Sequence, residues 1–216
     1  DDEDRLVGVL MHDDMLDIVE EEVDEDLRAL GGVKADEELS DNVLFIAKSR
    51  FAWLFVNLIT AFIASMVLKG FEDELQKMVA LAVLAPIVAS QGGNAATQTM
   101  TVAVRALATR ELSASNRARV IGRELLVGLL NGFAFALITG AIAAIWFHTF
   151  DLGVVIAIAM VINLLAAALA GILIPLTVSR MKADPAVASG PFVTTVTDIV
   201  GFFSFLGTAT LWFGLK

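Results

Sequence analysis

The sequence predicts an all-α integral membrane protein with five transmembrane helices per subunit, preceded by an amphipathic cytoplasmic helix. Three observations lead to this fold class. Hydrophobic residues make up 57% of the 216 residues, whereas a soluble domain contains about 45–50%. The charge is segregated, because residues 1–41 hold 17 of the 25 acidic residues and only three of the 15 basic ones. Five nearly uncharged stretches follow, and a spanning helix needs about 20 apolar residues.

This composition excludes several functional classes. It is incompatible with a soluble enzyme of average composition and with a disordered chain. It also excludes a nucleic-acid binder, which would show a basic surface. Cysteine is absent, so the chain has no disulfide framework and no thiolate metal site. The two histidines, His12 and His148, lie too far apart in the sequence to indicate a histidine-rich transition-metal site.

The acidic segment predicts a short strand at residues 5–10 and then an amphipathic helix that ends at Gly31-Gly32. Apolar residues recur three and four positions apart, the spacing of one helix face: Leu16, Val19, Val23, Leu27 and Leu30. Acidic residues form a second stripe with this spacing: Asp14, Asp17, Glu21 and Glu25. Like charges four apart destabilise a helix. We therefore expect either a solvated acidic face or a face that binds divalent cations.

Charged residues bound the five expected spans, which cover residues 51–68, 78–104, 125–147, 152–179 and 185–215. The first is short, and the second, fourth and fifth are long enough to tilt or to contain an interruption. Nine basic residues flank the spans on the side of the acidic segment and three on the other side. The positive-inside rule therefore places the acidic segment in the cytoplasm and the C-terminus outside. The chain begins with Asp1, so we expect a fragment of a longer protein.

The second span contains a proline followed by a glycine pair and amide side chains. Its polar and backbone-loosening residues are Pro86, Gly92, Gly93, Asn94, Thr97 and Gln98. Proline removes a helical hydrogen bond, and glycine weakens a helix. Non-helical backbone is tolerated at membrane depth only inside protein or beside water. The pattern predicts a broken helix that faces the interior of the bundle and offers oxygen ligands to a hard cation, with a packed proline kink as the alternative.

The fifth span shows a related pattern. Asp184-Pro185 is typical of a helix cap and first turn, and Gly190-Pro191 indicates a second local break. With an offset of 99 residues, Pro86 aligns with Pro185, and residues 88–90 and 187–189 both read Val-Ala-Ser. The two spans run in opposite directions, which is the pattern of an inverted repeat whose paired broken helices line a substrate path.

Asp198 lies near the middle of the last span. An ionised carboxylate there costs about 2.5–3.5 kcal/mol on insertion scales. Thr194, Thr195 and Gly201 share its helix face, and no lysine or arginine lies at comparable depth in another span. The expected partner is water, an ion or a neutralising proton. Carboxylate, amide and hydroxyl oxygens without thiol or imidazole favour Mg²⁺, Ca²⁺ or Mn²⁺, and Mg²⁺ often keeps its waters and uses one or two carboxylates.

Taken together, these segments resemble the membrane domain of the MgtE-type magnesium channels. The resemblance rests on Pro86 with residues 92–94, on Asp184-Pro185, Gly190-Pro191 and Thr197-Asp198, and on the acidic run of residues 20–26. It implies a homodimer in membrane lipid with the pore at the dimer interface. Residues 1–12 would be the remnant of a cytoplasmic CBS domain, residues 13–50 the acidic connecting (plug) helix and linker, and residues 51–216 the ion-channel domain.

The resemblance also implies roles for individual residues. Asp198 would hold a hydrated Mg²⁺ in the pore, and the backbone at Thr194 would line it. The Mg²⁺-sensing face of the plug helix would comprise Asp14, Asp17, Glu22, Glu25 and Asp26.

The expected function is passive Mg²⁺ uptake across a prokaryotic inner membrane, driven by the membrane potential and closed by cytoplasmic Mg²⁺ in the intact protein. Mn²⁺, Co²⁺ and Ca²⁺ are alternative transported ions. The chain is not expected to be an enzyme, because an intramembrane hydrolase needs a second carboxylate or a serine beside a base. A proton-coupled divalent-cation exporter that uses Asp198 as carrier is the main alternative. A purely structural membrane anchor would leave unexplained the free-energy cost of placing Asp198 within a span.

Overall fold

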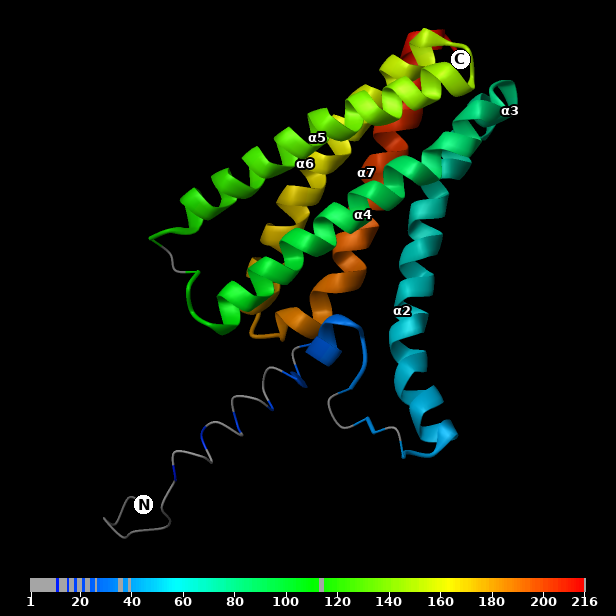
Figure 1. Ribbon diagram of the computed structural model, residues 1–216. Helices are drawn as coiled ribbons and strands as arrows, with labels where there is room; N and C mark the ends of the chain where they lie inside the picture. Colours follow the sequence, from blue (N-terminus) through cyan, green and yellow to red (C-terminus); the bar gives the residue numbers. More distant parts are fainter. Residues whose placement is uncertain are drawn as a thin grey trace. The chain divides into compact units, whose positions relative to one another are not determined.

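The computed structural model describes residues 11, 15, 18, 21, 24–25, 27–34, 37–38, 40–112 and 115–215. Apart from turns and loops, these residues are helical: α2 (Val43–Gly70), α3 (Glu72–Lys77), α4 (Val79–Ala108), α5 (Arg117–Trp146), α6 (Phe150–Arg180) and α7 (Pro185–Phe213) (Figure 1). Among the described residues, five helices, all but α3, are long and apolar enough to cross a membrane. The predicted fold class is confirmed, whereas the strand expected at residues 5–10 lies outside the described residues. The chain divides into two units, Asp1–Trp53 and Leu54–Lys216.

In the first unit, a helical turn ends at the predicted glycine pair. Residues 27–30 are helical, and Gly32 takes a left-handed φ of 72°. The N–H of Val33 then donates to the Arg28 carbonyl at 3.0 Å. A side chain at Gly32 would also collide with the indole of Trp53, because a Cβ there would lie 2.1 Å from Nε1. Glycine is therefore required at this position both by backbone conformation and by space.

The core of the second unit forms around α6. This helix packs against α4, α5 and α7, and α4 packs against α7 (Figure 1). The largest fully buried side chains come from these helices, and they include Phe205, Leu81, Leu84, Met160 and Leu164. Small residues bring α5 close to α6, since a Cβ added at Gly140 would lie only 2.8 Å from the Gly153 carbonyl oxygen. These close approaches match the small-residue spacing typical of helix pairs in membranes.

Helix α2 differs from the others, because Ala64 is its only described buried residue. Large apolar side chains such as Phe51, Leu54 and Phe62 are each 63% exposed. A helix with this surface is stable in hydrocarbon but not in water, which is consistent with a membrane span.

The predicted helix breaks are wrong. Helix α4 is continuous through Pro86 and through Gly92-Gly93, and α7 is continuous through Pro191. Both prolines lie beyond the first turn, so each removes one hydrogen bond to the carbonyl four residues before it, and the remaining bonds of the helix hold it continuous. The glycine pair stays helical because it packs closely against neighbouring helices, and tertiary packing overrides weak helix propensity.

Three helices end at a residue other than glycine with a left-handed backbone. Arg110 follows α4 with φ 57°, His148 follows α5 with φ 52°, and Lys182 follows α6 with φ 59°. Left-handed backbone costs an L-residue roughly 1–2 kcal/mol. Two of these three residues carry a positive charge close to the carbonyl end of the preceding helix, where cations are stabilised.

Candidate functional site

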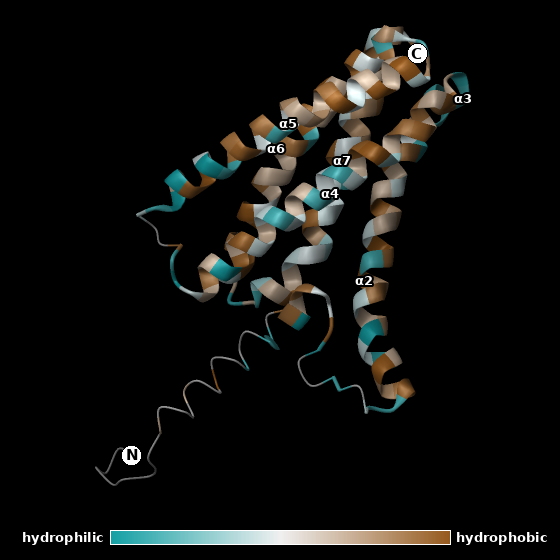
Figure 2. Ribbon diagram, in the orientation of Figure 1, coloured by the Kyte–Doolittle hydropathy of each residue, from teal (hydrophilic) through white to brown (hydrophobic). Residues whose placement is uncertain are grey.

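The candidate site lies on α4 and α7, the two least hydrophobic of the five spans. Figure 2 shows hydrophilic residues interrupting the hydrophobic ones along α4. The N-terminus of α7 is fixed as the sequence predicts, because the Oδ1 atom of Asp184 accepts a hydrogen bond from the N–H of Ala186 at 2.8 Å and Pro185 occupies the first turn. This cap fixes the residue at which α7 begins.

Asp198 is about halfway along α7 and is partly exposed. Among the described residues, no ion pair or hydrogen bond involves its carboxylate. Its neighbour Thr197 is fully buried, whereas Val196 is 36% exposed. Asp198 therefore stands at the border between the packed face and the open face of α7, where an ion or water can reach it without unpacking the helix.

The threonines near Asp198 satisfy their hydroxyl groups within α7. Thr194 Oγ1 donates to the carbonyls of Gly190 and Pro191, each at 3.2 Å. The hydroxyl of Thr195 also donates to the Pro191 carbonyl, and Thr197 Oγ1 donates to the Thr194 carbonyl at 2.9 Å. Back-bonding of this kind makes a hydroxyl compatible with an apolar environment. These oxygens keep only lone pairs for an ion, and Pro191 itself is buried.

Helix α4 has a packed face and an exposed polar face. The buried residues recur at helical spacing, as in Leu81, Leu84, Val88, Gly92 and Ala96. The opposite face exposes a polar stripe, which consists of Ser90, Asn94, Thr97, Gln98 and Thr101. Within one copy of the chain, the small residues of this segment are packed and its amides are exposed. That the amides face a bundle interior therefore stays a prediction.

The two helices meet at small residues near Asp198. A Cβ added at Gly93 of α4 would lie 3.9 Å from Thr197 Oγ1, and one added at Gly201 of α7 would lie 3.3 Å from the Cα of Ala89. Gly201 thus serves helix contact, and it offers no side-chain ligand. Asn94 follows Gly93 on α4, and Asp198 follows Thr197 on α7. The carboxylate and the amide therefore each lie one residue from the contact between the two helices.

Sequence reasoning missed two buried polar residues behind these helices. Asn163 of α6 is completely buried, and its Nδ2 donates to the Val88 carbonyl of α4 at 2.8 Å. Glu124 of α5 is 9% exposed and accepts a hydrogen bond from Thr99 Oγ1 of α4 at 3.4 Å. An uncharged amide inside an apolar run gives little signal, and Glu124 immediately precedes the span predicted at residues 125–147, where a charged residue is expected.

The donor set suits a hydrated cation better than a directly bound transition metal. Within the described part of the chain, no three His, Cys, Asp or Glu side chains gather closely enough to hold a metal ion. One carboxylate with neighbouring amide and hydroxyl oxygens can instead hydrogen-bond to the water shell of a hard cation such as Mg²⁺. Of the predicted regulatory acids, only Glu25 is described, and it is exposed. Asp14, Asp17, Glu22 and Asp26 lie outside the described residues.

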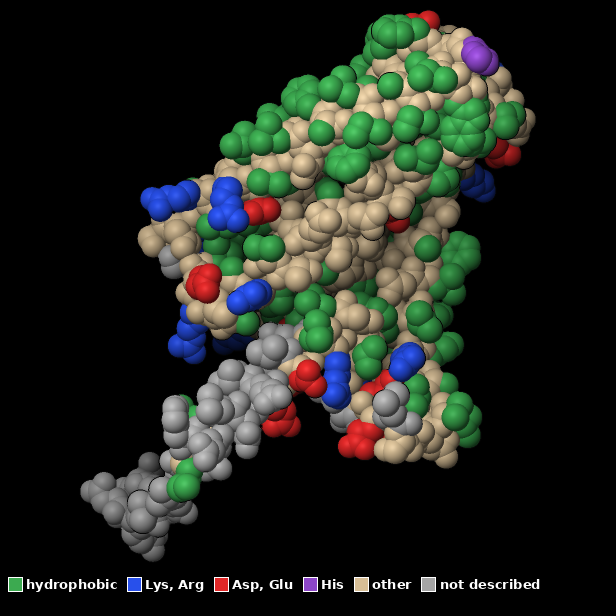
Figure 3. Space-filling model, viewed as in Figure 1, with side chains coloured by type: hydrophobic (Ala, Val, Ile, Leu, Met, Phe, Trp, Pro, Cys, Tyr) green, Lys and Arg blue, Asp and Glu red, His purple; other side chains and the backbone are tan. Residues whose placement is uncertain are grey.

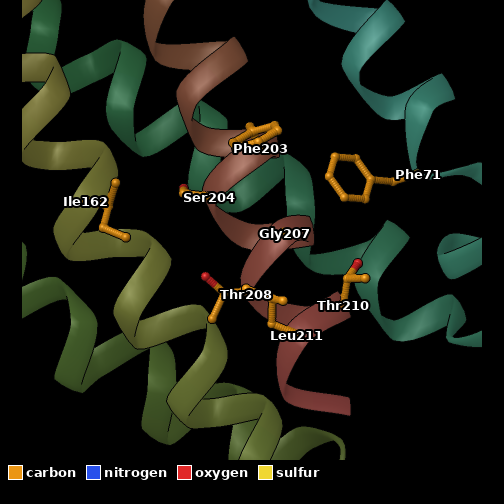
Figure 4. Close-up of a pocket in the computed structure, with 8 residues that line it drawn as sticks. All are labelled: Phe71, Ile162, Phe203, Ser204, Gly207, Thr208, Thr210 and Leu211. Carbon is orange, nitrogen blue, oxygen red and sulfur yellow. The ribbon is translucent and has the colours of Figure 1, made fainter. Parts of the chain in front are cut away.

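An apolar groove of about 500 Å³ lies elsewhere on α7 (Figure 4). Its lining residues are Phe71, Ile162, Phe203, Ser204, Gly207, Thr208, Thr210 and Leu211. Phe71 and Phe203 meet edge to face, with ring centroids 6.0 Å apart. The groove has no charged lining residue and does not include Asp198, so it offers nothing to a cation.

Basic side chains gather at one end of the second unit, where α4 ends and α5 begins (Figure 3). The sequence supplies Arg105, Arg110, Arg117, Arg119 and Arg123 there. Between this end and the opposite one, the surface in this view consists mostly of hydrophobic side chains interspersed with backbone and other uncharged side chains. This distribution is typical of a membrane protein with one positively charged boundary.

Comparison with known proteins adds independent information. Residues 85–208 match the MgtE family model, which is described as a divalent cation transporter. The chain is 35% identical over 212 residues to the magnesium transporter MgtE of Enterococcus faecalis, covering 98% of this chain and 47% of that protein. The proteins of the same name from Bacillus subtilis and Thermus thermophilus are 32% and 36% identical, over 95% and 98% of this chain and 46% and 47% of their own lengths. The chain thus spans about half the length of these relatives.

Proposed function

Because this chain belongs to the MgtE family of divalent cation transporters, we propose that it forms the membrane domain of a magnesium transporter. The transport is passive and inward. The membrane potential drives it, at about 2.3 kcal/mol per elementary charge per 100 mV and thus about twice that for Mg²⁺. The matched relatives are transporters by name, which supports a role in ion passage rather than in catalysis.

The observation that carries this proposal is the partly exposed carboxylate of Asp198, which has no partner among the described residues and follows a residue in contact with α4, whose opposite face exposes a polar stripe. Polar side chains on a span are unfavourable against lipid. They become favourable when a second copy of the chain covers them and leaves a water-filled path between the copies. In such a homodimer, two Asp198 carboxylates hold one Mg²⁺ through its hydration shell, because Mg²⁺ gives up water reluctantly.

The acidic segment supplies regulation in this proposal. Residues 1–12 belong to a CBS domain and residues 13–50 to the plug helix and linker, on the cytoplasmic side of a prokaryotic inner membrane. Cytoplasmic Mg²⁺ binds the sensing face and removes repulsion between acidic side chains. Since that repulsion is strongest in the compact arrangement, bound Mg²⁺ stabilises the closed state.

Transport into liposomes tests the proposal. The full chain is reconstituted with a Mg²⁺-sensitive dye inside the vesicles, and a potassium diffusion potential drives uptake. We expect Asp198→Ala to reduce Mg²⁺ uptake to the level of empty vesicles, and Asp198→Asn to reduce it at least tenfold, because the charge that attracts the ion is lost. Asp151→Asn is the matched control, since Asp151 is exposed at the start of α6. Undiminished uptake by a folded Asp198→Ala protein would overturn the role of this carboxylate.

A proton-coupled exporter is a second candidate, because a lone carboxylate within a span is also suited to carry a proton. The same vesicles separate the two functions. Collapsing the pH gradient at constant membrane potential leaves passive Mg²⁺ flux unchanged, whereas it abolishes flux through a proton-coupled carrier.

A further inference from the structure

We propose that Asn163 is a positioning residue that holds α4 and α7 at a fixed spacing and thereby sets the affinity of the Asp198 site for its cation. Its consequence for transport rests on the function proposed above. The contact itself is a property of the fold and can be tested without transport.

The amide of Asn163 occupies a hollow that two glycines create. A Cβ added at Gly92 of α4 would lie 2.1 Å from Asn163 Nδ2, and one added at Gly201 of α7 would lie 2.8 Å from the same atom. The side chain therefore touches both helices from α6, and any side chain at either glycine would displace it. Its Nδ2 atom also donates to the Val88 carbonyl, one turn before Gly92.

The Asn163 Oδ1 atom is buried and has no hydrogen-bond partner among the described residues. An unsatisfied buried oxygen is unfavourable. The filling of the hollow does not by itself require a polar group. The amide is accounted for by its hydrogen bond to the Val88 carbonyl, which ties α6 to α4 at a fixed point.

The hollow lies directly behind the candidate ion site. Gly201 is three residues after Asp198 and so lies close to it on the surface of α7. Gly92 precedes Gly93, whose added Cβ would contact the Thr197 hydroxyl, and Thr197 precedes Asp198. A change in the size or polarity of residue 163 therefore shifts the two helices relative to one another where the carboxylate emerges. We expect a change in cation affinity rather than a complete loss of flux.

A double-mutant cycle tests the contact. The three atoms nearest to a Cβ at Gly92 all belong to Asn163. Gly92→Ala should therefore lower the melting temperature in detergent by at least about 5 °C, and adding Asn163→Ala should restore part of that loss. The matched control is Gly207→Ala on α7, where an added Cβ meets nothing within 4 Å; it should leave the melting temperature unchanged or raise it. Independent, additive effects of Gly92→Ala and Asn163→Ala would overturn the contact.

Asn163→Leu tests the positioning role, because it keeps the number of side-chain heavy atoms and removes the amide. We expect the variant to fold, as near-unchanged circular dichroism in detergent would show, while the Mg²⁺ concentration for half-maximal uptake changes at least threefold. A residue with a merely structural role would leave that concentration unchanged, and this result would overturn the proposal. If the wild type carried no Mg²⁺, the proposed function would fail, whereas the melting-temperature cycle would still decide whether Asn163 links α4 and α7.

Discussion

Helix α6 buries fifteen of its 31 residues, whereas α4 buries eleven of 30 and α7 ten of 29. The predicted motifs are distributed in the opposite way, because they lie on α4 and α7, whereas α6 is the most hydrophobic of the five spans and its Pro175 and Asn163 are buried. The two helices with predicted motifs thus expose polar groups, while the most buried helix determines where those groups lie. The following substitutions test this division.

The largest effect on stability is expected where α7 faces α6. Phe205 is fully buried and Phe203 is 63% exposed on the same helix. Phe205→Ala should lower the free energy of unfolding by about 3–5 kcal/mol, because it leaves a cavity in the core. Phe203→Ala should lower it by less than about 1 kcal/mol. Thermal unfolding in detergent measures both. Equal effects would show that the two faces of α7 do not differ as described.

The next largest effect is expected at the contact between α6 and α4. A Cβ at Gly171 would lie 2.7 Å from the Ala96 carbonyl oxygen and 2.8 Å from the Thr99 Cβ. Because the first of these is backbone, it cannot move aside cheaply, and Gly171→Ala should cost about 2–3 kcal/mol of stability. Gly122→Ala on α5 is the control, since nothing lies within 4 Å of a Cβ there. The same unfolding assay applies, and a neutral Gly171→Ala would argue against α6 as the organising helix.

A smaller effect is expected for buried polar groups. Thr99→Val removes the hydroxyl that donates to the buried Glu124 carboxylate. It should destabilise the fold by about 1 kcal/mol, because it leaves an acceptor without its partner. Thr97→Val on the exposed face of α4 removes a hydroxyl that bonds only to the Gly93 carbonyl of its own helix. It should change stability by less than about 0.5 kcal/mol. A reversed order in guanidinium or thermal unfolding would contradict the assignment of the two faces.

The smallest stability effect is expected at Asn94, which is exposed on α4. Asn94→Ala should leave the free energy of unfolding within about 0.5 kcal/mol of the wild type. Under the proposed function, it should nevertheless reduce Mg²⁺ uptake several-fold, because an amide beside the ion path is lost. Unchanged uptake, measured in the liposome assay, would show that the polar stripe of α4 takes no part in conduction.

The five spans could be predicted from sequence because charged residues bound them, and burying charge in lipid is costly. The helix ends differ by several residues at α2 and α5, since helices continue beyond the hydrocarbon until a turn stops them. The short helix α3 was not foreseen. Its six residues, Glu72–Lys77, are too few to show a helical pattern.

The candidate site was predictable only in part. Asp198 stood out because it is a lone charge in an apolar span, and the structure leaves it without a partner among the described residues. The predicted breaks failed because proline and glycine propensities describe a helix alone, whereas Gly92 is held by Asn163. The partners of Asn163 and Glu124 cannot be predicted from the sequence. In both cases the partner lies on another helix, so the contact depends on the three-dimensional packing.

The left-handed residues after α4 and α6 have a consequence for stability engineering. Glycine at Arg110 or Lys182 would relieve backbone strain and is the obvious choice for a more heat-resistant protein. Yet each replacement also deletes a positive charge at a turn between spans, the kind of charge that directs membrane insertion. A thermostabilised variant should therefore begin at His148, where the backbone has the same left-handed φ and no lysine or arginine is lost.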